Sequence, residues 1–121
     1  MEPITFLALN RNAIIVRRKK PFIDWANSLE DRGPELHLDD PQPERTVYLV
    51  DQRTAYLDPG PALRKHCRTI FEHELALWHL DPGDWPSKRD LSTFSEWFDV
   101  EFHSLVLDLA DIAFEFEELA A

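Results

Sequence analysis

The residue whose position is most unusual for its type is Glu74, a carboxylate inside an otherwise apolar stripe. Apolar residues between Pro61 and Leu80 recur at spacings of three and four, which predicts an amphipathic helix. A carboxylate at the centre of that face is costly to bury unless a donor or cation pairs with it. Burial also raises a carboxyl pKa, as in many catalytic acids and bases. The apolar face around Glu74 consists of Leu63, Cys67, Ile70, Phe71, Leu77 and Trp78.

Two interpretations of Glu74 follow from its position. In the first, Glu74 is a general acid or base that acts with His103 and Asp99, in a pocket between the long helix and the last predicted strand. In the second, which we favour, it is a structural carboxylate at the rim of the core, because most buried ion pairs are structural. The partners we consider for it are His103, an arginine of the first predicted strand, and the indole N–H of Trp85 or Trp97.

The histidines and the cysteine predict neither a metal site nor a nucleophile. His66 and His73 are separated by two helical turns, about 10 Å of rise, which is too far for both to bind one ion. Cys67 is the only cysteine, and burial in the helix face would raise its pKa and make it unreactive. His103 and Ser104 are consecutive in a predicted strand, so their side chains point to opposite faces. With three glycines and no phosphate-binding loop, the sequence leads us to expect no cofactor and no metal.

The elements that must position these residues are three strands and three helices. β-Branched and aromatic runs predict the strands, whereas prolines, an aspartate cap and helical spacing predict the helices. The strands are expected at Ala13–Arg17, Thr46–Val50 and Val100–Leu109, the last one covered on both faces. The helices are expected from Pro21 to a stop near Gly33-Pro34, from Pro61 to Leu80, and after Asp90 as far as Phe98.

Such an element order predicts an α+β domain. We expect a three- or four-stranded mixed or antiparallel sheet with two or three helices packed on one face. Residues 1–121 form a single domain in this interpretation. Residues 1–9 are either an extra strand that folds back on the first one or a loose extension, and residues 111–121 are an acidic segment compatible with strand or helix.

Composition narrows the class of protein. The chain has 121 residues, 44% of them hydrophobic, and a formal net charge of −10, which argues against nucleic-acid binding. The charge is unevenly spread: Arg17 to Lys20 are four consecutive bases, whereas Glu96 to Glu118 contains eight acids and no base. A lone cysteine, the absence of a signal-peptide pattern and the absence of a long apolar run favour a cytoplasmic protein without a membrane partner.

Two segments carry a resemblance. They are Asn10-Arg11 leading to Pro21-Phe22-Ile23-Asp24-Trp25, and Trp85-Pro86 followed by Phe94, Trp97-Phe98-Asp99 and Glu101-Phe102-His103-Ser104. Over most of residues 10–110 the chain resembles small acidic bacterial proteins with no known activity. The resemblance implies a self-contained domain and transfers no catalytic residue.

The expected function is therefore that of a small cytosolic interaction or regulatory domain without catalytic activity. Its partner is expected to be a protein, with a second copy of the chain as one candidate, because exposed Trp and Phe side chains remain to be covered. The alternative is a small enzyme or ligand-binding protein with a pocket around Glu74 and His103. An acidic mimic of nucleic acid is a weaker alternative.

Overall fold

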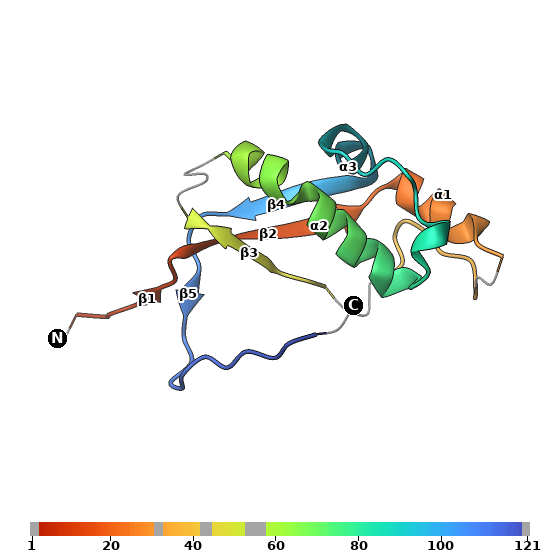
Figure 1. The fold of residues 1–121 in the computed structure, drawn as a ribbon. Coiled ribbons are helices and arrows are strands. Elements are labelled where there is room, and N and C mark those ends of the chain that lie inside the picture. Colours follow the sequence, from red (N-terminus) through yellow and green to blue (C-terminus); the bar gives the residue numbers. More distant parts are fainter. Residues whose placement is uncertain (1–2, 31–32, 42–44, 53–57, 120–121) are drawn as a thin grey trace.

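Three helices and two small antiparallel sheets make up the structure, a computed structural model that describes residues 3–30, 33–41, 45–52 and 58–119 (Figure 1). The α+β class predicted from the sequence is confirmed. The helices are α1 (Lys20–Ser28), α2 (Gly60–Trp78) and α3 (Leu91–Trp97), with a 3-10 turn, η2 (Pro82–Asp84), before α3. The strands are β1 (Leu7–Ala8), β2 (Arg11–Arg18), β3 (Tyr48–Asp51), β4 (Phe98–His103) and β5 (Leu107–Asp108).

The main sheet has the strand order β3-β2-β4, with both pairings antiparallel. Ile14 in the central strand lies opposite Tyr48 on one side and Phe102 on the other. Because side chains alternate along a strand, Ile14, Val16 and Arg18 share one face of the sheet, and Ile15 and Arg17 share the other.

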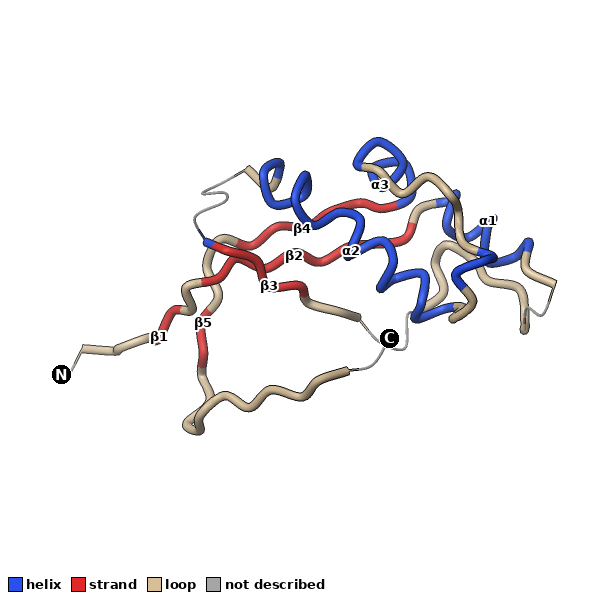
Figure 2. Tube along the Cα trace, viewed as in Figure 1, coloured by secondary structure: helices blue, strands red, loops and turns tan. Residues whose placement is uncertain are grey.

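α2 and α3 lie on one side of this sheet, α1 lies beyond the end of β2 next to α3, and no helix covers the other face (Figures 1 and 2). One apolar cluster joins the helices to the sheet, and every element of this layer contributes to it. Aromatic rings form its centre: the ring of Phe71 on α2 lies 5.3 Å from those of Trp97 and Phe98 and 6.1 Å from that of Phe94. The fully buried Phe22 connects α1 to the same group through Trp97 and Phe98.

Local signals in the sequence account for where the helices begin. Prolines occupy the first turns of α1 and α2, where the missing N–H carries no penalty. The carboxylate of Asp90 accepts a hydrogen bond from the backbone N–H of Thr93 and caps α3, as predicted. Both ends of α2 and α3 lie within two residues of the predicted ones, whereas α1 ends at Ser28, before the predicted stop near Gly33-Pro34.

The prediction of one long final strand over Val100–Leu109 is wrong. β4 ends at His103, and a separate short strand, β5, pairs with β1 away from the main sheet. β4 is an edge strand of a sheet covered on only one face, so Asp99, Glu101 and His103 are exposed. The apolar residues after it therefore leave the core instead of lining it.

Three further parts of the chain differ from the predictions: the N-terminal segment, Leu77 and the C-terminal segment. Residues 4–9 contain the two-residue strand β1, which pairs with β5 and not with β2. Leu77 is 40% exposed, whereas Leu75 is fully buried. Leu75 follows Phe71 by one turn, on the side of α2 that contacts Phe94 of α3. Residues 111–119 have neither helix nor strand, and residues 120–121 lie outside the described ranges.

Candidate functional site

Glu74 is buried, as the helical spacing predicts, with 3% of its surface exposed. The hydroxyl of Tyr48 on β3 donates a hydrogen bond of 2.6 Å to Oε2 of Glu74. The same hydroxyl lies 2.7 Å from Nδ1 of His73, and that nitrogen is 3.9 Å from the Glu74 carboxylate. Tyr48 therefore links the carboxylate to a partly exposed histidine.

The electrostatic effects in this cluster oppose one another. Burial raises the pKa of Glu74, whereas the Tyr48 hydrogen bond and the charges of Arg18 and His73 act to lower it. Burial also raises the pKa of Tyr48, and the charge of Glu74 reinforces that rise. The Tyr48 hydroxyl therefore keeps its proton and serves as a donor.

Arg18, at the end of β2, is the cation whose charge acts on Glu74. It lies one residue beyond the predicted strand Ala13–Arg17, and the arginine inside that strand, Arg17, is on the opposite face of the sheet. Its guanidinium carbon lies 4.6 Å from the ring centroid of Phe22 and 5.6 Å from that of Trp78. Burial lowers the pKa of Arg18, and Glu74 counteracts this effect. Within the described ranges, its buried Nε has no hydrogen-bond partner.

The structure does not bring His103 or Asp99 to Glu74. Both residues lie on the uncovered face of β4, whereas Glu74 lies beneath α2 on the helix side. Nε2 of His103 is 2.9 Å from Oε2 of Glu101, and Arg17 reaches Glu101 at 3.4 Å. This bond to His103 lowers the pKa of Glu101 most, and the charges of Arg17 and Arg45 add to the effect.

The partner that sequence reasoning missed for Glu74 is Tyr48. The sequence placed Tyr48 in a predicted strand, but the spacing of residues did not indicate which helix residue it would contact. Trp85 was considered for this role, and its indole N–H instead donates to the carbonyl of His79.

Cys67 is buried and has a raised pKa, chiefly because of burial, as expected of an unreactive core thiol.

Within the described ranges, one group of side chains has metal-ligand atoms within 4.8 Å of one another: His79, Asp81 and Asp84. Internal bonds already engage them, because Asp84 contacts Nε2 of His79 and Asp81 accepts from the N–H of Gly83. These bonds shape the loop around η2, which is a structural role.

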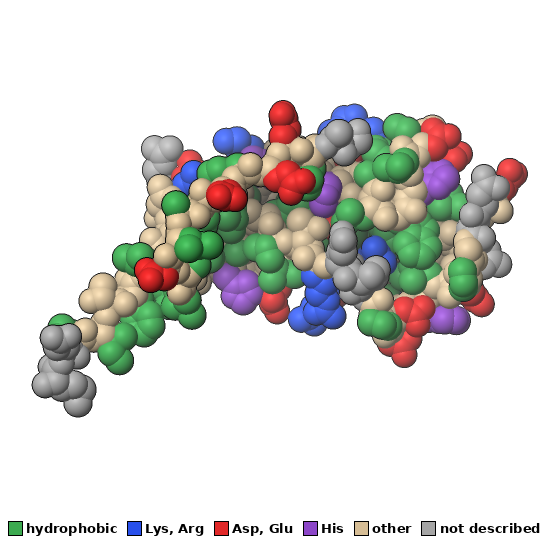
Figure 3. All heavy atoms as spheres, turned by 90° about the horizontal axis from the view of Figure 1, so that it is seen from below, with side chains coloured by type: hydrophobic (Ala, Val, Ile, Leu, Met, Phe, Trp, Pro, Cys, Tyr) green, Lys and Arg blue, Asp and Glu red, His purple; other side chains and the backbone are tan. Residues whose placement is uncertain are grey.

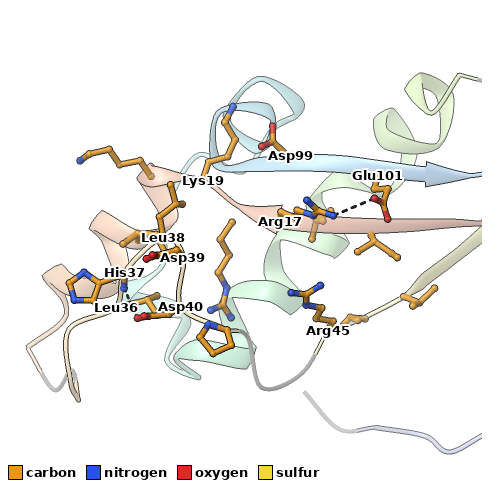
Figure 4. Close-up of a pocket in the computed structure, with 18 residues that line it drawn as sticks. Arg17, Lys19, Leu36, His37, Leu38, Asp39, Asp40, Arg45, Asp99 and Glu101 are labelled. Atoms are coloured by element: carbon orange, nitrogen blue, oxygen red, sulfur yellow. Dashed lines mark hydrogen bonds and ion pairs between the residues drawn. The ribbon is translucent and has the colours of Figure 1, made fainter.

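A cleft of about 830 Å³ opens at the end of β2 (Figure 4). One wall is residues 36–41, and the opposite wall is residues 45–47, which lead into β3. Five cations line the cleft, together with four acids and several apolar side chains. The cations are Arg17, Arg18, Lys19, Lys20 and Arg45, and the acids are Asp39, Asp40, Asp99 and Glu101.

We define two terminal arms, residues 4–9 and 105–119. The first projects away from the main sheet, and the second leaves the sheet, turns after β5 and runs back beneath it (Figure 1). β1 and β5 join them as a ribbon, and the backbone N–H of Leu9 donates to the carbonyl of Val106. Fifteen large apolar side chains are exposed in the described residues, and ten of them lie on these arms. Seen from the side opposite the helices, apolar side chains continue along the projecting arm (Figure 3). The ten are Ile4, Phe6, Leu7, Leu105, Leu107, Leu109, Ile112, Phe114, Phe116 and Leu119.

Comparisons of the chain with protein-family models, with curated proteins and with solved structures found no match. No helix in the described part of the chain has the length and apolar character required to cross a membrane.

Proposed function

We propose that this protein is a small cytosolic interaction domain, without catalytic activity of its own, that binds a protein through its terminal arms. The observation that carries the proposal is the concentration of exposed apolar side chains on those arms. Phe116 is 96% exposed, and Leu109 and Ile112 are each 80% exposed. Contiguous apolar surface of this kind is characteristic of interaction sites.

The helical layer is the firmly packed part of the molecule to which the arms are attached. Aromatic contacts fix α1, α2 and α3 on the sheet, and none of the four tryptophans belongs to an arm. The arms, in contrast, are joined by only two residues of each strand. A two-stranded ribbon of this size is marginally stable in water, so a partner that covers it would add stability.

The alternative, a pocket built around Glu74 and His103, gains no support from the geometry. The two residues lie on opposite sides of the sheet, and each is hydrogen-bonded to a different neighbour. The Glu74 cluster matches the structural interpretation better, because Tyr48 satisfies the buried carboxylate.

Affinity capture with the full-length chain tests the proposal. The triple variant Phe6→Ser, Phe114→Ser, Phe116→Ser removes three exposed aromatic rings from the arms and leaves the core intact. The wild-type chain is expected to retain a protein partner that this variant loses, while both keep the same thermal midpoint.

The matched control is Leu77→Ser with Leu80→Ser, two exposed leucines that lie outside the arms and do not line the cleft. This control should retain the partner. Loss of the partner in the control, or its retention in the triple variant, would show that the arms are not the binding surface.

A further inference from the structure

Along one edge of β2, only half of the strand is paired within the part of the chain that the structure describes. β4 pairs with β2 from Ala13 to Arg18, but β3 pairs with it only from Arg11 to Ile14. Over Ile15–Arg18 the side of β2 that faces β3 therefore has no strand partner within the described ranges. An open strand edge presents unpaired N–H and C=O groups that accept a further strand.

The cleft described above lies along this open edge. Residues 45–47 diverge from β2 and form one wall. The other wall is held in place, because the side chain of Asn27 bonds both the N–H and the carbonyl of Leu36, each at 2.8 Å. Apolar side chains in the cleft include Ile15, Leu36 and Val47. The cleft thus follows the open edge and has both apolar and charged walls.

The cations of the cleft differ in how fully they are already paired. Arg17 contacts Glu101, the ammonium of Lys20 contacts Asp24 at 2.7 Å, and that of Lys19 donates to the carbonyl of Ser95 at 3.1 Å. The guanidinium of Arg18 is held between two rings, and its buried Nε lacks a partner among the described residues. Arg45 is exposed on the opposite wall. A carboxylate entering the cleft would meet both arginines.

The chain itself carries a segment with the complementary properties. Residues 111–119 have no helix or strand, and all of them are exposed. In an extended conformation Ile112, Phe114 and Phe116 would form one row, and Glu115 and Glu117 would lie on the other side. This segment contains four acids and no base, whereas the cleft has five cations and four acids, so that its cations outnumber its acids by one.

We propose that residues 111–119 of one copy add as a strand to the open edge of β2, over Ile15–Arg18, in the cleft of a second copy. The proposal deepens the proposed function by naming the partner and the mode of binding, and it rests on that function. Backbone pairing would supply affinity, and carboxylates near Arg18 and Arg45 would fix the position of the segment.

Binding of residues 111–119 to the cleft of a second copy accounts for the exposed surface better than binding to the cleft of their own chain. In the single chain, residues 111–119 are exposed, and none of them lines the chain's own cleft. Because donor segment and acceptor cleft belong to the same chain, two copies can satisfy each other around a two-fold axis and close the assembly. Such an exchange also brings the apolar side chains of both arms toward the partner.

Sedimentation velocity on the full-length chain tests this proposal. The wild-type chain is expected to sediment with twice its mass of 14.2 kDa. Arg45→Glu, or Glu115→Arg with Glu117→Arg, should weaken the dimer at least about tenfold, and combining all three substitutions should restore most of the affinity. Arg64→Glu, which reverses an exposed cation of α2, is the control and should leave the dimer unchanged.

Cross-linking distinguishes exchange between copies from fold-back. A zero-length reagent applied to a mixture of light and heavy isotope-labelled chains should join Glu115 or Glu117 to Lys19 or Lys20. The proposal requires linked peptides that combine light and heavy chains.

A monomeric wild-type chain, cross-links confined to one chain, or a dimer indifferent to the charge reversals would each overturn the second-copy proposal. The interaction function is tested independently, by whether the triple arm variant loses a captured partner. A monomer that still captures a different protein through its arms would reject the exchange and retain the function.

Discussion

Glu74 shows how one hydrogen bond makes a buried carboxylate tolerable. Its environment consists of Tyr48 from β3, His73 from its own helix and the charge of Arg18 from β2. Removing any of these groups would raise the pKa of Glu74 further, because less would oppose the effect of burial. We therefore expect the carboxylate to contribute to stability in a pH-dependent manner.

Replacing Glu74 by Gln should remove that dependence, because Gln keeps an acceptor for Tyr48 but does not ionise. The pKa of Glu74 is raised in the folded chain above its ordinary value of 4.5. The folded state thus holds the proton more tightly than the unfolded state. The stabilisation that protonated Glu74 provides is complete below the ordinary pKa, and it is lost as pH rises through the folded pKa.

Urea unfolding of both proteins between about pH 4 and about pH 8 measures this effect. The free energy of unfolding of the wild type, relative to Glu74→Gln, should fall as pH rises. If this difference in the free energy of unfolding stays constant or grows with pH, burial is not the main influence on the pKa of Glu74.

The helices are held together by aromatic rings more than by polar contacts. Phe71 is fully buried and touches Phe94, Trp97 and Phe98, so it joins α2 to both α3 and β4. Phe71→Ala should lower the free energy of unfolding by about 3–5 kcal/mol, as core phenylalanine truncations do. Equilibrium urea unfolding measures the loss. Leu63→Ala, at a partly buried position on the same helix, should cost clearly less, and equal losses would contradict this account of the core.

Helical periodicity predicted much of this layer. It identified α2 and the burial of Cys67, Ile70, Phe71 and Glu74, because a helix packed on a sheet buries one stripe. It was wrong at Leu77, since α3 covers a second side of α2, and that contact depends on where the chain goes after η2. Local spacing contains no such information.

The strands were harder to predict than the helices. Alternation in Val100–Leu109 is equally compatible with a central strand and with an edge strand that leaves the sheet, so the sequence could not distinguish these. The contact between Tyr48 and Glu74 joins residues from separate elements, and only the register of β3 against β2 determines it. The candidate cleft depends on where β3 stops pairing, which no local motif marks.

The whole molecule separates its charges in a way that bears on assembly. The segment from Glu96 to Glu118 contains eight acids and no Lys or Arg, and the densest run of bases lies at Arg17–Lys20. If two copies exchange their acidic segments, oppositely charged regions meet, and dissolved salt should weaken the contact.

We therefore expect the dissociation constant of the dimer to rise about tenfold between about 0.05 M and about 0.5 M NaCl. Sedimentation equilibrium at several salt concentrations provides the measurement. An association that strengthens with salt would indicate that apolar burial alone drives it, and the charge pairing proposed for Arg18 and Arg45 would then be wrong.

The spacing of acids in the last segment also bears on aggregation. A segment with Ile112, Phe114 and Phe116 in one row has the apolar alternation that favours stacking of identical strands into fibrils. Glu115, Glu117 and Glu118 would place like charges side by side in every layer of such a stack, which disfavours its growth. The same acids that suit a cationic cleft therefore discourage the segment from assembling with copies of itself.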